Sequence, residues 1–104
     1  MGVNLLEQSI SNVKAIPAEL NLIDQKELAL LLKDLEDARL TIFIKTKEAA
    51  PLLERCAETS EVLKQRALDE APPTEEGVKV AFSSFEKAVM KLRNTIMVRT
   101  QRAT

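Results

Sequence analysis

Hydrophobic residues near the C-terminal end of the chain are spaced alternately four and three positions apart. They are Val78, Phe82, Phe85, Val89, Leu92 and Ile96. This spacing fits the seam of a left-handed coiled coil, although the core-facing side of an ordinary helical bundle has the same spacing. Small residues recur at Ala81, Ala88 and Thr95, where they would let a neighbouring helix approach closely. The pattern predicts a helix over about 75–102.

A second helical pattern runs over 18–50 without an internal glycine or proline. Its seam consists of Leu28, Leu31, Leu35, Ala38 and Ile42. Leu30, Leu40 and Ile44 lie off this seam, so the helix is apolar on more than one side and is expected to have more than one partner. Because Asp24 is a good capping residue, a break near that position stays open as an alternative.

Prolines and one loop divide the rest of the chain. Pro17 lacks a backbone donor and disfavours helical geometry at the preceding residue, so a short helix over about 4–16 is expected to end there. Pro51 marks a further corner, followed by a helix over about 51–71. The stretch EAPPTEEG is the clearest loop, and Thr74 before two glutamates predicts the start of the last helix. We expect long antiparallel helices joined at this loop, with the short N-terminal helix folded back on them.

Composition agrees with an all-α fold, a helical hairpin or coiled-coil-like bundle. The 104 residues fit a single domain over 1–104, 45 % of them are hydrophobic, and only two are glycine and four proline. The last stretch, MVRTQRAT, has no glycine or proline to end the helix. We therefore expect the chain to be a piece of a longer protein, and a complete small protein with a fraying C-terminal end is the alternative.

The charge is nearly balanced over the whole chain but uneven along it. The formal net charge is −1 and the pI is about 5.5, which gives no overall attraction to nucleic acid or to an acidic membrane. Five bases close the chain with no acid among them, namely Lys87, Lys91, Arg93, Arg99 and Arg102. Because no aromatic platform accompanies them, a solvated helix end explains them better than a nucleic-acid site does.

The residues of most catalytic and metal sites are missing from the sequence. There is no histidine, and the single cysteine, Cys56, lies on an apolar stripe where a buried structural thiol is expected. The two glycines are isolated, so no phosphate-binding loop is present. We expect no enzyme activity, no cofactor, no metal and no small-molecule substrate. A single cysteine and the lack of a long apolar run predict a soluble intracellular protein.

Two segments resemble the N-terminal helical domain of the inhibitor of growth (ING) family. The first is LLEQSISNVKAIPAEL, residues 5–20, in which the matching residues are Leu6, Glu7, Ile10, Val13, Pro17, Glu19 and Leu20. LLLKDLED, residues 30–37, is similar to the stretch that follows in the family. The second segment, residues 74–93, looks like the family's last helix at Thr74, Glu76, Val78, Lys79, Ala81, Phe85, Glu86, Val89 and Arg93. Residues 40–70 match no motif of the family, and its common tyrosines are absent.

The ING resemblance implies a helical dimerisation and scaffold domain of a nuclear histone acetyltransferase or deacetylase complex. The partner would be a second copy or a helical subunit. The protein-interface candidates are Leu28, Leu31, Leu35, Ile42, Phe82, Phe85, Val89, Leu92 and Ile96. The zinc-binding histone reader of the family cannot form here, because the chain has one cysteine and no histidine.

A shorter stretch supports a second hypothesis. Residues 83–96, SSFEKAVMKLRNTI, look like the N-terminal coiled-coil region of the exocyst subunit Exo-seventy. With the basic run from Lys87 to Arg102, this resemblance suggests a monomeric four-helix bundle that acts as a tethering or membrane-proximal regulatory module. A small prokaryotic or viral helical binding protein is a further alternative. Molar mass in solution would separate the first hypothesis from the second.

Overall fold

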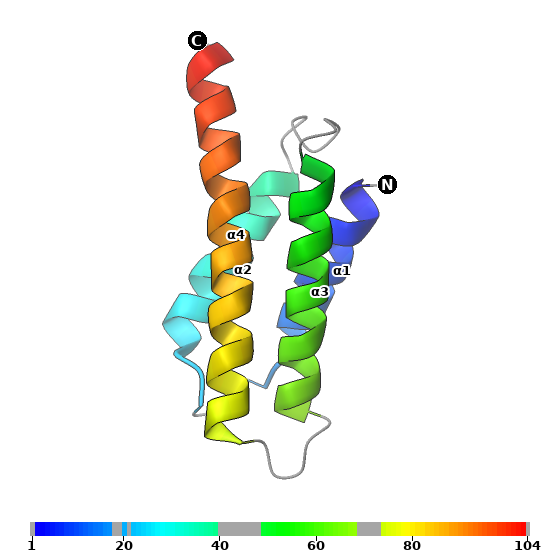
Figure 1. Cartoon of the computed structure of the whole chain (residues 1–104), viewed down its shortest axis with the longest axis vertical. Coiled ribbons are helices and arrows are strands. Elements are labelled where there is room, and N and C mark those ends of the chain that lie inside the picture. The colour runs from blue at the N-terminus through cyan, green and yellow to red at the C-terminus, as the bar shows by residue number, and fades with distance from the viewer. Residues whose placement is uncertain (1, 18–19, 21, 40–48, 69–73, 104) are drawn as a thin grey trace.

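The computed structural model describes residues 2–17, 20, 22–39, 49–68 and 74–103. Within these ranges the regular structure is helical throughout, in four helices that Figure 1 labels in chain order. They are α1 (Gly2–Lys14), α2 (Gln25–Arg39), α3 (Ala49–Leu68) and α4 (Glu75–Ala103). The predicted all-α fold is therefore confirmed.

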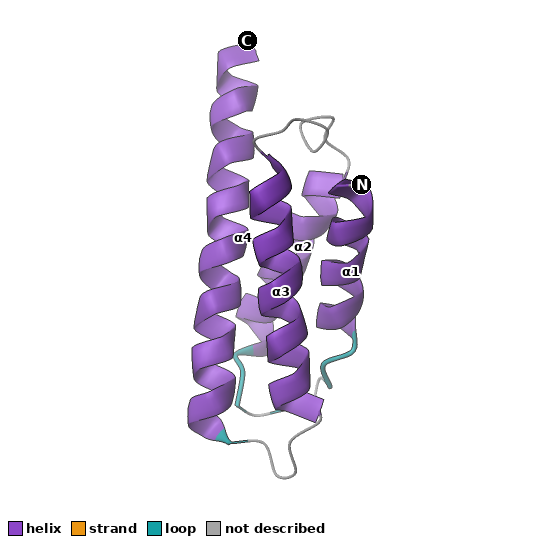
Figure 2. Ribbon diagram, turned by 45° about the vertical axis from the view of Figure 1, so that its right-hand side comes forward, coloured by secondary structure: helices purple, strands orange, loops and turns teal. Residues whose placement is uncertain are grey.

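The four helices form an elongated bundle in which each helix has two close neighbours. The close pairs are α3 with α4, α1 with α3, α1 with α2, and α2 with α4. The α3–α4 pair thus occupies the side of the bundle opposite the α1–α2 pair, and α3 and α4 run antiparallel, as predicted for the long hairpin (Figure 1). The C-terminal turns of α4 extend past the ends of the other helices (Figure 2).

The connection between α1 and α2 shows why the expected helix over 18–50 is shorter than predicted. Helix α2 begins only at Gln25, because Asp24 caps it: the Oδ1 atom of Asp24 accepts hydrogen bonds from the backbone nitrogens of Lys26 (2.9 Å) and Glu27 (3.4 Å). The alternative break near Asp24 is thus the correct one. The Gln25 side chain donates a hydrogen bond to the Leu20 carbonyl at 2.9 Å, which ties the corner to the first turn of α2. Residues 40–48, at the end of the expected helix, lie outside the described residues.

The first turns of α3 and α4 follow the rules for helix starts. Helix α3 begins two residues before the predicted corner, because Pro51 is tolerated in a first turn, where no backbone donor is needed. The Thr74 hydroxyl accepts a hydrogen bond from the Gly77 nitrogen at 3.2 Å, which confirms the predicted cap of α4. A Cβ atom at Gly77 would lie 2.6 Å from the Thr74 hydroxyl oxygen and 3.1 Å from Nη1 of Arg66, so a larger residue there would displace these two side chains.

The core lies between the four helices and is mostly aliphatic. Its largest fully buried side chains are Phe85, Leu6, Leu35, Leu53, Leu63 and Leu92. A polar contact between described residues crosses it, a hydrogen bond of 3.1 Å from the side-chain amide of Asn12 on α1 to the hydroxyl of Ser60 on α3. The Ser60 hydroxyl in turn donates to the Ala57 carbonyl at 2.9 Å, so this buried hydroxyl has a partner on both sides.

Candidate functional site

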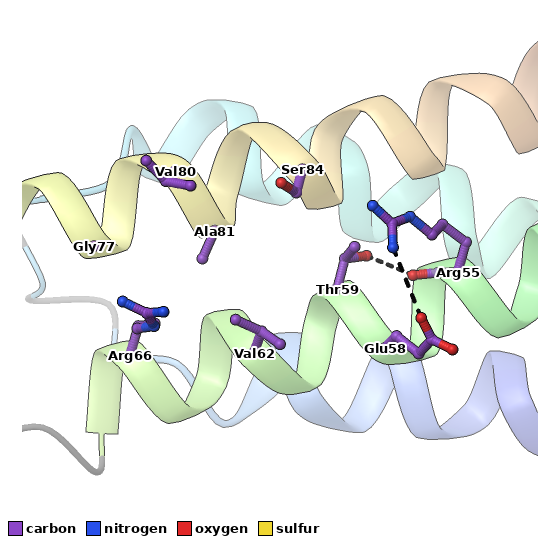
Figure 3. A pocket seen from close by; sticks show the side chains of 9 residues that line it. All are labelled: Arg55, Glu58, Thr59, Val62, Arg66, Gly77, Val80, Ala81 and Ser84. Atoms are coloured by element: carbon purple, nitrogen blue, oxygen red, sulfur yellow. Dashed lines mark hydrogen bonds and ion pairs between the residues drawn. The ribbon is translucent and has the colours of Figure 1, made fainter.

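A groove runs along the outer side of the α3–α4 pair, away from α1 and α2. Its first part has a volume of about 210 Å³. The side chains that line it come from α3 (Arg55, Glu58, Thr59, Val62 and Arg66) and from α4 (Gly77, Val80, Ala81 and Ser84). Figure 3 shows Ala81 pointing toward α3, and Thr59 and Arg55 reaching toward α4. The groove is therefore formed by two helices whose relative position the bundle core fixes.

A more open hollow of about 740 Å³ continues the groove along α4. It shares Arg55 and Ser84 with the first part. Its other lining residues are Pro51, Leu52, Lys87, Ala88, Met90, Lys91 and Asn94. The two hollows together make one surface strip that extends from the Gly77 end of α4 to Asn94.

Small residues of α4 line the groove at helical spacing. Gly77, Ala81, Ser84 and Ala88 are four, three and four positions apart, which places them on one side of the helix. Ala81 and Ala88, each 5 % exposed, lie where α4 packs on α3, so the small-residue seam noted in the sequence faces α3. Because these side chains are short, the space above them stays open.

Exposed apolar side chains border this strip. Val62 is 41 % exposed, Val80 62 % and Met90 49 %. They lie off the core-facing stripe of their helices, beside the fully buried Leu63 and the 1 % exposed Val89. Sequence periodicity did not identify them as site residues, since it selects residues that repeat on one side. For Val62 and Val80, a β-branched residue beside the core-facing stripe is the signal that could have identified them; no such signal marks Met90.

Most of the predicted interface residues lie inside the bundle and not on its surface. Six of them are at most 6 % exposed and form part of the chain's own core: Leu28, Leu31, Leu35, Phe85, Val89 and Leu92. Phe82 is partly buried and packs against that core. Ile42 and the side chain of Ile96 lie outside the described residues. In this fold the neighbouring helices of the same chain cover these six side chains.

Three further properties of the described residues concern thiol reactivity, metal binding and membrane spanning. Burial raises the pKa of the Cys56 thiol to about 12, so this thiol stays protonated and unreactive near neutral pH. No group of three or more His, Cys, Asp or Glu residues in the described ranges is placed to hold a metal ion. None of the helices in this part of the chain is long and apolar enough to span a bilayer.

No protein-family model, curated protein or solved structure matches the chain. The fold and the groove on their own define the class, which is an all-α bundle with an outward-facing groove between two antiparallel helices.

Proposed function

We propose that the chain is a non-catalytic interaction domain that binds a helix of another polypeptide in the α3–α4 groove. The observation that carries this proposal is the exposure of Val62, Val80 and Met90 along a strip of small residues. Apolar side chains left open beside a concave surface are typical of a binding site for a helix. A partner helix would cover the valines and bring its own side chains over Ala81 and Ser84.

The position of the groove favours binding with little reorganisation. Both walls belong to helices whose inner sides are anchored by buried residues, among them Leu63 on α3 and Phe85 on α4, each 0 % exposed. A surface that is already ordered loses little conformational entropy when a ligand binds, so more of the contact energy contributes to affinity. Short side chains also permit close approach of helix axes, which improves packing.

Within this class, we propose the role of a scaffold or dimerisation subunit in a chromatin-modifying complex. Support comes from the resemblance of residues 5–20 and 74–93 to the ING N-terminal domain. The second of these segments contains Gly77, Val80, Ala81 and Ser84, which are the α4 wall of the groove. The resemblance and the surface geometry therefore concern the same helix.

The proposal is tested by adding an uncharged amphipathic helical peptide, with leucine and alanine on one side and glutamine on the other. We expect amide NMR signals of α3 and α4 around Ser84 to shift on titration. Replacing Ser84 with tryptophan should fill the groove and abolish these shifts. Ser83→Trp is the matched control, because Ser83 is the adjacent exposed residue and lines neither hollow. Equal binding to both variants, or no binding to the unmodified chain, would refute the proposal.

One observation favours the alternative of a tethering or membrane-proximal module. Helix α4 projects beyond the bundle, and from Lys87 onward its charged residues are all basic (Figure 1). A basic helix is attracted to anionic lipid at low ionic strength. Co-sedimentation with vesicles containing phosphatidylserine at low salt supports this alternative, and the absence of co-sedimentation removes it.

A further inference from the structure

We infer that the α3–α4 groove selects an acidic amphipathic helix from a different protein. This inference rests on the proposed function and specifies the chemistry of the partner. It is carried by the charged side chains that line the groove. Their net charge is positive, whereas the net charge of the whole chain is −1.

The charged side chains that line the groove are mostly basic. Arg55 and Arg66 on α3 and Lys87 and Lys91 on α4 contribute four cations, against the single carboxylate of Glu58. The formal net charge of the whole chain is −1, so positive charge is concentrated on this surface. The Glu58 carboxylate lies 3.8 Å from the Arg55 guanidinium and is already paired. The same ion pair engages Arg55, so acidic groups on a partner would chiefly meet Lys87 and Lys91, in the second hollow.

The lysines are the best placed to recognise a partner. Lys87 and Lys91 are four positions apart, so they lie one above the other on the same side of α4. Within the described part of the chain, neither of their ammonium groups forms an ion pair. Two acids one helical turn apart on a partner would match them.

A second copy of the chain fits this surface less well. In a symmetric dimer of two identical chains, the same patch occurs on both sides of the interface. Self-pairing through the groove would bring the Lys87 and Lys91 ammonium groups of both copies into one interface, where like charges repel. Nucleic acid is also a poor match, because no aromatic side chain lines either hollow and single-stranded bases need a stacking platform.

The test uses three helical peptides with the same leucine and alanine side and with glutamate, glutamine or lysine on the other side. We expect the glutamate peptide to bind about tenfold more tightly than the lysine peptide, which corresponds to about 1.4 kcal/mol. Raising the ionic strength from about 0.01 M to about 1 M should remove this difference, because the Debye length falls from about 30 Å to about 3 Å.

Charge-reversal variants test whether Lys87 and Lys91 cause the preference for the glutamate peptide. The double variant Lys87→Glu/Lys91→Glu should reverse the preference, so that the lysine peptide binds more tightly than the glutamate peptide. The matched control is Lys26→Glu/Lys33→Glu, which makes the same charge change at two exposed positions of α2, in the helix pair opposite the groove. This control should keep the preference for the glutamate peptide. Circular dichroism verifies that both double variants are folded.

The outcomes separate the two proposals. Equal binding of the three peptides, blocked by Ser84→Trp, overturns the acidic partner but leaves the docking groove intact. No binding of any peptide overturns both. Sedimentation of the chain alone gives a further outcome: a dimer that Ser84→Trp dissociates would show that the occupant is a second copy, which overturns the inference.

Discussion

The side-chain amide of Asn12 and the hydroxyl of Ser60 are joined by a hydrogen bond of 3.1 Å that connects α1 to α3 inside the core. Asn12 is 5 % exposed and Ser60 is 0 % exposed. This pair aligns the two helices at one register, because a shift along the axis would take the buried Asn12 amide away from its acceptor, while the Ser60 hydroxyl would keep its bond to the Ala57 carbonyl.

Replacing Asn12 with alanine should therefore destabilise the chain. We expect a loss of about 1–3 kcal/mol in the free energy of unfolding, measured by urea denaturation. Ser60→Ala should cost less, and the double variant should cost less than the sum of the two, because one interaction is removed only once. Strictly additive losses would contradict a direct coupling.

Truncation of Phe85 should show that α4 is anchored within the chain's own core. Phe85 is the largest fully buried side chain, and Phe85→Ala should cost about 3–5 kcal/mol in unfolding free energy. Val80→Ala is the control on the same helix, and it should change stability by at most about 0.5 kcal/mol, since Val80 is 62 % exposed. Similar losses for the two variants would mean that Val80 is covered in solution.

Replacing Gly77 with alanine changes two contributions to the stability of α4, namely the helix propensity of this residue and the cap formed by Thr74. Alanine stabilises a helix interior by about 1 kcal/mol relative to glycine, but its Cβ would displace the Thr74 hydroxyl and break a cap contributing about 1 kcal/mol. Gly77→Ala should therefore leave the unfolding free energy nearly unchanged. In a Thr74→Ala background, where no cap remains to be lost, the same replacement should stabilise the chain by about 1 kcal/mol. Thermal denaturation of the four combinations checks this, and a stabilisation of equal size in both backgrounds would contradict it.

The buried thiol of Cys56 makes stability depend on alkaline pH. Burial raises its pKa from 9.0 to about 12, so between these values the unfolded chain loses a proton that the folded chain keeps. Stability then falls as pH rises, by about 1.4 kcal/mol between about pH 8 and about pH 10. Cys56→Ala should remove this part of the slope, as measured by urea denaturation at both pH values. Identical slopes for the two proteins would show that the thiol is accessible.

Much of the fold follows from the sequence because the buried residues of a helix recur every three or four positions along the chain. The spacing of Val78, Phe85 and Val89 predicted the core-facing side of α4, and all three are at most 1 % exposed. The cap at Thr74 followed from one residue and its neighbours. The same periodicity cannot tell whether a stripe is covered by the same chain or by another, and for this reason Leu35 and Phe85 were expected at an interface.

The groove could not be predicted in the same way. Its shape depends on the distance between α3 and α4, which is set by the packing of Ala81 and Ala88 and has no counterpart in a single helix pattern. Arg55 and Lys87 are thirty-two positions apart and line the same hollow only because α3 and α4 are antiparallel. Such a site becomes visible only when the helices are assembled.

The separation along the chain between helices that pack together affects the folding pathway. Helices α3 and α4 are joined by a short connection, so closing this hairpin costs little chain entropy, whereas α1 must find α3 across the whole of α2. The hairpin should therefore be structured in the folding transition state before α1 docks. Substitutions at Leu63 or Val89 would then slow refolding, while substitutions at Val13 would mainly accelerate unfolding.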